Sequence, residues 1–91
     1  MKIAVSSQNF GTVTAHAGKA RRFIVFDLAT PCMPREVERL DLPRELAMHE
    51  FRGLHHPLFA MDAVITGGAG EGFVRRLGAR GIEVVRTGET D

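Results

Sequence analysis

One stretch of the sequence decides the fold: AVITGGAGEGFVRRLGARGIEVV, residues 63–85. It opens with a short apolar run, which is typical of a buried strand, and continues through the glycine-rich turn GGAG. In residues 71–80 the side chains of Phe73 and Leu77 recur at helical spacing, which predicts an amphipathic helix that ends at Gly81. A second apolar run follows. The stretch therefore predicts two parallel strands joined by a helix in a right-handed crossover.

The segments on the N-terminal side extend this unit into a sheet. Residues 3–5 form a compact apolar run, and residues 22–28 are rich in β-branched and aromatic side chains, so both are predicted strands. The short connection to residues 37–42 favours an antiparallel hairpin. Residues 43–61 are predicted to form one or two short helices, with Pro57 near the first turn of the second.

The expected fold is therefore an α/β domain with a central mixed β-sheet. Its parallel part comes from the first strand and the 63–85 unit, and the hairpin adds antiparallel strands. The predicted core consists of the apolar side chains of these elements: Ile3, Val5, Phe23, Val25, Val64, Ile65, Phe73, Leu77, Ile82 and Val84.

Length and composition narrow the class of protein. The chain has 91 residues, 44% hydrophobic and 25% charged, which fits a single globular domain over residues 1–91. The net charge of +1 lacks the basic excess typical of nucleic-acid binders, so we expect no nucleic-acid partner. No apolar run reaches membrane-spanning length, and the N-terminus does not read as a signal peptide. We therefore expect a cytoplasmic protein without a membrane partner.

The glycine-rich turn at Gly67, Gly68 and Gly70 invites a nucleotide-binding interpretation, because a helix N-terminus suits phosphate. However, Phe73 stands where the third glycine of a dinucleotide fingerprint belongs, and no Lys-Ser or Lys-Thr pair follows as in a phosphate loop. Glu71 would also repel phosphate. A tight turn that packs a helix closely against a strand is the simpler interpretation.

The histidines and the single cysteine do not define a site by their spacing. None of His16, His49, His55 and His56 forms a zinc-protease motif, and each is more simply a surface or capping residue. Cys32 offers a soft thiolate, but one cysteine cannot hold a standard iron–sulfur cluster, which needs about four. No spacing identifies a nucleophile with its base or a pair of carboxylates, so we do not expect an enzyme.

The whole chain nevertheless resembles the dinitrogenase iron–molybdenum cofactor biosynthesis family, which includes NifX-like and NafY-like carriers and the C-terminal domain of NifB. The similar segments are KIAVS at 2–6, HAGKARRFIVF at 16–26, DAVITGGAG at 62–70 and LGARGIEVV at 77–85. The second segment resembles the family's His-Phe-Gly-Arg-Ala segment, with Ala17 in place of the usual phenylalanine. The radical domain of NifB, with its three-cysteine motif, has no counterpart here.

This resemblance implies a ribonuclease-H-like three-layer fold and a role in nitrogen fixation. It also implies transient binding of the iron–molybdenum cofactor or an iron–sulfur precursor cluster, with nitrogenase assembly proteins as possible partners. The family's cofactor-holding histidine maps onto His16. Nearby cations and the glycine turn complete the expected cofactor site, which comprises His16, Gly18, Lys19, Arg21, Arg22, Gly67, Gly68 and Gly70. The candidate metal ligands are His16, Cys32 and His56. The alternatives are a phosphate- or nucleotide-binding module and a protein–protein adaptor.

Overall fold

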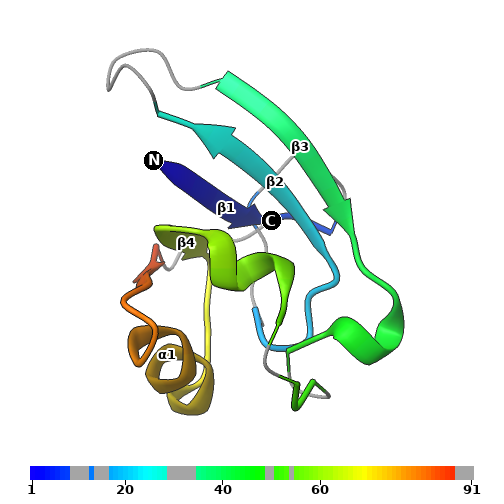
Figure 1. The fold of residues 1–91 in the computed structure, drawn as a ribbon, viewed down its shortest axis with the longest axis vertical. Helices are drawn as coiled ribbons and strands as arrows, with labels where there is room; N and C mark the ends of the chain where they lie inside the picture. Colours follow the sequence, from blue (N-terminus) through cyan, green and yellow to red (C-terminus); the bar gives the residue numbers. More distant parts are fainter. Residues whose placement is uncertain (9–12, 14–16, 29–34, 49–50, 54, 88–91) are drawn as a thin grey trace.

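The structure is a computed structural model that describes residues 1–8, 13, 17–28, 35–48, 51–53 and 55–87. Its centre is a five-stranded sheet in the order β3-β2-β1-β4-β5 (Figure 1). The strands are β1 (Lys2–Ser6), β2 (Arg22–Asp27), β3 (Arg35–Asp41), β4 (Ala63–Thr66) and β5 (Glu83–Arg86). One α-helix, α1 (Glu71–Gly78), and two short 3-10 helices, η1 (Arg44–Leu46) and η2 (Pro57–Ala60), complete the described elements.

The sheet is mixed, as the sequence predicts. β1, β4 and β5 run parallel to one another, and α1 forms the connection between β4 and β5. β2 pairs antiparallel with both β1 and β3, so the predicted hairpin is confirmed. The α/β class is confirmed, and the arrangement agrees with the three-layer ribonuclease-H-like fold that the family resemblance implies. Among the described residues, α1 supplies a layer on one face of this sheet.

The core lies on one face of the sheet, where residues of α1 and of the segment between β3 and β4 pack together. Ala4 of β1 is paired with Val25 on one side and Val64 on the other, and all three side chains are essentially inaccessible to solvent. Phe73 and Leu77 of α1 belong to the same buried cluster. The predicted helical face therefore points into the core, where apolar burial supplies most of the stability of so short a helix.

The predicted core was only partly right. Phe23, Val25, Val64, Phe73, Leu77 and Ile82 are buried, whereas Ile3, Val5, Ile65 and Val84 are half-buried. Successive side chains of a strand point to opposite faces of the sheet. In β1 the smaller Ala4 and Ser6 lie on the buried face of the sheet, so the larger Ile3 and Val5 must lie on the other face.

The ends of the helices follow local sequence. Gly81 has φ 77°, a left-handed conformation that glycine adopts without steric cost, and it ends the turn after α1. α1 itself stops at Gly78, slightly earlier than the predicted helix. η2 begins with Pro57 in its first turn, as predicted, and His56 caps it. Within the described ranges, no helix has the length and apolar character needed to cross a membrane.

Candidate functional site

A cavity of about 560 Å³ lies beside the N-terminal end of α1. This volume is in the range of small-molecule and cofactor sites. Among the described residues, three parts of the chain form its walls: the turn after residue 16, the segment after η1, and α1 with its N-cap. The described lining residues are Gly18, Lys19, Met48, Arg52, Gly70, Gly72, Phe73 and Arg76.

Hydrogen bonds between distant segments place the cavity at the carboxyl end of β4. The Ala17 N–H donates to Gly68 O at 3.0 Å, which fixes the 17–19 turn against the glycine-rich turn. The Thr66 hydroxyl also donates to Gly68 O, at 3.0 Å. The buried Ser6 hydroxyl, at the end of β1, donates in turn to Thr66 Oγ1 at 2.8 Å. The ends of two parallel strands thus meet where ligands of α/β sheets characteristically bind.

This geometry brings together some of the predicted site residues. Gly18 and Lys19 share the cavity with Gly70, although about fifty residues of sequence separate them. Gly67 and Gly68 shape the turn behind the cavity but do not line it. Gly68 has a structural role, because its carbonyl oxygen accepts from the Ala17 N–H and from the Thr66 hydroxyl.

Two glycines give the cavity a wall of bare backbone. Gly70 is the N-cap of α1, and Gly72 lies in its first turn. A Cβ added at either position would meet no atom within 4 Å. The first N–H groups of a helix have no intrahelical partner, so this wall also offers backbone donors. A bulky ligand can therefore approach the chain closely here.

The charged side chains among the described lining residues are all positive. Lys19 and Arg52 are exposed, and Arg76 is half-buried. Burial lowers the pKa of Arg76 below its ordinary value, and the nearby charges of Arg52 and Arg80 lower it further. Among the residues that the structure describes, no carboxylate forms an ion pair with Arg76. The excess of positive charge favours an anionic ligand.

The other side chains among the described lining residues are apolar. Met48 and Phe73 are 3% and 8% exposed, so both are anchored in the core while they contribute to the cavity wall. A polarisable thioether and an aromatic ring suit a soft, weakly hydrated surface better than a strongly hydrated one. Cationic and apolar groups together are therefore complementary to a large anion of low charge density.

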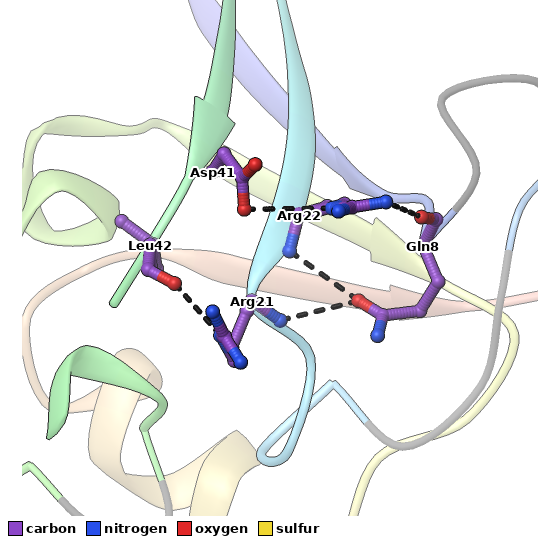
Figure 2. A network of polar contacts seen from close by, with 5 residues as sticks. All are labelled: Gln8, Arg21, Arg22, Asp41 and Leu42. Atoms are coloured by element: carbon purple, nitrogen blue, oxygen red, sulfur yellow. Dashed lines mark hydrogen bonds and ion pairs between the residues drawn. The ribbon is translucent and has the colours of Figure 1, made fainter. Parts of the chain in front are cut away.

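Arg21 and Arg22 do not line the cavity, contrary to the site expected from the sequence. Both take part instead in a network of polar contacts with Gln8, Asp41 and Leu42 (Figure 2). Arg21 Nε donates to Leu42 O at 2.8 Å, and Arg22 Nη1 donates to Gln8 O at 2.9 Å. The backbone N–H groups of both arginines also donate to Gln8 Oε1. Arg22 further contacts Asp41 at 3.4 Å. These contacts link the start of β2 to Gln8, in the segment after β1, and to the end of β3 and the residue after it, so the two side chains have structural roles.

His56 is engaged by the backbone, which argues against it as a metal ligand. Its Nδ1 accepts from the Leu58 N–H at 3.0 Å, so Nε2 carries the proton that it donates to Leu46 O at 2.6 Å. Burial lowers the pKa of His56, the bond to Leu46 raises it, and the charge of Arg76 lowers it. The capping role considered for this residue from the sequence is the one that the structure shows.

The other metal candidates, His16 and Cys32, lie outside the described residues, as does His49. His55 is described and exposed. Within the described ranges, no group of three or more His, Cys, Asp or Glu side chains is placed to hold a metal ion.

Met48, Arg52 and Arg76 are cavity residues that the sequence analysis did not identify. For Arg76 a signal existed, because it lies one helical turn after Gly72 and therefore on the same side of α1. Met48 and Arg52 lie between η1 and η2, in the 43–61 segment, where the sequence predicted helices but no site at either residue. Only the tertiary fold brings them to α1.

Fold and cavity define a small α/β domain with a cationic, glycine-walled site at the carboxyl end of its parallel strands. A family model described as dinitrogenase iron-molybdenum cofactor matches residues 1–91, and the chain belongs to this family. The crystal structure of a protein designated PH0822 is similar, with a TM-score of 0.72 and 22% sequence identity. The match covers 94% of this chain and 78% of that one, and it supports the fold. No curated protein sequence matches the chain.

Proposed function

We propose that the protein is a carrier that binds the iron–molybdenum cofactor, or an iron–sulfur precursor of it, during cofactor assembly and does not itself catalyse a reaction. The observation that carries this proposal is the cavity, which combines the cations Lys19, Arg52 and Arg76 with the bare glycine backbone at the start of α1. Membership of the iron–molybdenum cofactor family supports the choice of ligand.

The chemistry of such a cluster matches the cavity. A metal–sulfur cofactor is large and anionic, and it already carries its own sulfides, so a carrier needs few protein ligands. Lys19, Arg52 and Arg76 would offset its charge, and charge-assisted hydrogen bonds to such groups contribute about 1.5–3 kcal/mol each. The side chains of Met48 and Phe73 would contact its less hydrated surface. Attachment of this kind is labile, as onward transfer requires.

A protein ligand to the cluster would come from His16. This residue directly precedes Ala17, the position that is hydrogen-bonded to the glycine-rich turn behind the cavity. One imidazole binds a metal more weakly than several thiolates, so it suits a carrier that must release its cargo. In this proposal His16 supplies the metal–ligand bond, and the cavity supplies charge complementarity.

Titration distinguishes this function from its alternatives. Isolated iron–molybdenum cofactor is added to the protein under anaerobic conditions, and binding is followed by the absorption of the cluster. Separate titrations use inorganic phosphate and ATP. The proposal expects cofactor binding at micromolar concentration or tighter and no comparable binding of phosphate or ATP. The reverse result would identify a nucleotide-binding module. Binding of neither, with capture of nitrogenase assembly proteins, would identify an adaptor.

A further inference from the structure

Arg76 connects the two sides of the cavity. It belongs to α1, and its Nη1 donates to Met48 O, on the facing wall, at 2.9 Å. Its Cζ also lies 5.6 Å from the centroid of the Phe51 ring, within the range of a cation–π contact. Met48 and Arg52 line the cavity from this facing segment. A single guanidinium therefore joins the α1 wall to the wall that carries two other lining residues.

Aromatic contacts support the facing wall, because Phe51 belongs to a packed cluster. The Phe51 ring packs edge-on against His56, with 4.9 Å between ring centroids, and against Phe59 at 6.1 Å. Arg80, also from the α1 side, lies over the Phe59 ring at 3.7 Å. The Phe51 N–H donates to Ala47 O at 3.0 Å. Arg76 thus binds to a packed aromatic cluster, so a change in its contacts should be transmitted to the whole segment.

The contacts of Arg76 distinguish it from the other two cations. Lys19 and Arg52 are exposed, whereas Arg76 is half-buried and donates to a backbone carbonyl across the cavity. A guanidinium can donate a directed hydrogen bond and present a planar face at the same time. The ammonium of a lysine carries the same charge but has no planar face. Substitution by lysine can therefore separate the charge of Arg76 from its contacts with Met48 and Phe51.

We infer that Arg76 is a positioning residue that sets the width of the cavity by holding Met48 and Phe51 against α1, and that this role outweighs its charge in ligand affinity. The part about affinity rests on the proposed cluster-carrier function. The part about geometry concerns the ligand-free protein and can be tested without any ligand.

The test compares Arg76→Lys with Arg75→Lys. Arg75 is the neighbouring arginine of α1; it is exposed and does not line the cavity. In ligand-free protein, amide hydrogen exchange at Phe51 is measured for both variants. The inference expects faster exchange at Phe51 in Arg76→Lys, by about fivefold to tenfold, and no change in Arg75→Lys. Unchanged exchange in Arg76→Lys would overturn the positioning role.

Affinity for isolated iron–molybdenum cofactor is then measured at low and high salt. If a variant loses affinity because a charge is missing, the loss becomes smaller at high salt, since salt screens charges. If it loses affinity because the cavity wall has moved, the loss is the same at both salt concentrations. The inference expects Arg76→Lys to weaken binding about fivefold to tenfold at both salt concentrations. Arg76→Gln should then weaken binding by a similar factor. Wild-type affinity in Arg76→Lys, with a salt-sensitive loss in Arg76→Gln, would show that Arg76 acts by charge alone.

The two experiments separate this inference from the proposed function. If Arg76→Lys alters exchange at Phe51 but the wild-type protein binds no cofactor, the proposed function fails and the positioning of the wall by Arg76 stands. If the wild-type protein binds cofactor and neither exchange nor affinity responds to Arg76→Lys, the inference fails and the proposed function stands.

Discussion

His16 is the residue on which the proposed metal–ligand bond depends. We expect His16→Ala to weaken binding of isolated iron–molybdenum cofactor at least about tenfold, or ~1.4 kcal/mol, because one ligand bond is removed. The melting temperature should stay nearly unchanged. His55→Ala, at an exposed position, is the matched control. Equal affinities in the two variants would contradict the role of His16 and direct attention to Cys32.

His56 makes stability depend on pH in a defined direction. Burial lowers its pKa in the folded state, so the folded protein favours the neutral ring whose Nδ1 accepts from Leu58. The neutral ring contributes its full stabilisation above the pKa of His56 in the unfolded chain, about 6.5. This stabilisation is lost as the pH falls through the lower pKa of His56 in the folded state. The free energy of unfolding should therefore decrease as the solution is acidified below about pH 6.5.

His56→Asn isolates this contribution, since asparagine can cap η2 but does not titrate. Urea unfolding between about pH 5 and pH 7 should show a flatter pH dependence for His56→Asn than for the control His55→Asn. Identical slopes in the two variants would show that protonation of His56 does not oppose folding.

At the residue scale the sequence predicted the site unevenly. Gly18, Lys19 and Gly70 were predicted and do line the cavity. Arg21 was predicted from its nearness to Lys19 in sequence, but its Nε donates to Leu42 O instead. Nearness along the chain could not reveal this contact. The pairing of β2 with β3, which sets Arg22 opposite Asp41, brings Leu42 next to Arg21.

At the scale of elements, the segment that follows α1 offers a test of local geometry. Gly81 has φ 77°, where a side chain is strained even though an added Cβ would meet no atom within 4 Å. Gly81→Ala should lower the free energy of unfolding by about 1–2 kcal/mol. Gly78→Ala, in the helix and equally free of contacts, should instead raise it by up to about 1 kcal/mol. Chemical denaturation measures both, and equal effects would contradict this account.

The elements were predictable because their signals are local. The apolar run of β4, the helical spacing of Phe73 and Leu77, and Gly81 specify a strand, a helix and its end. The side of the sheet that α1 covers was less predictable. It depends on strand register, which places the small Ala4 and not the larger Ile3 on the buried face of the sheet.

At the scale of the whole molecule, the cavity combines segments that no local pattern connects. Lys19 precedes β2, Arg52 follows η1, and Arg76 belongs to α1. The bond from Ala17 to Gly68 and that from Arg76 to Met48 hold these segments in place. The sequence could predict a crevice at the start of α1 from the general behaviour of parallel strands, but not the third wall.

The central claim is that the glycine-walled cavity holds the cluster, and a matched pair of variants tests it most directly. Gly72 lines the cavity and Gly78 does not, yet both belong to α1 and both have open space where a Cβ would be placed. Alanine at either position should leave the fold intact, since it favours the helix. Any difference in binding between them therefore reports on the cavity and not on stability.

The measurement is an anaerobic titration of isolated iron–molybdenum cofactor into the wild-type, Gly72→Ala and Gly78→Ala proteins. The account predicts that Gly72→Ala weakens binding about tenfold, because the methyl group obstructs close approach to the backbone, and that Gly78→Ala binds like the wild type. Wild-type affinity in Gly72→Ala, measured alongside tight binding in the other two proteins, would show that the cluster is held elsewhere.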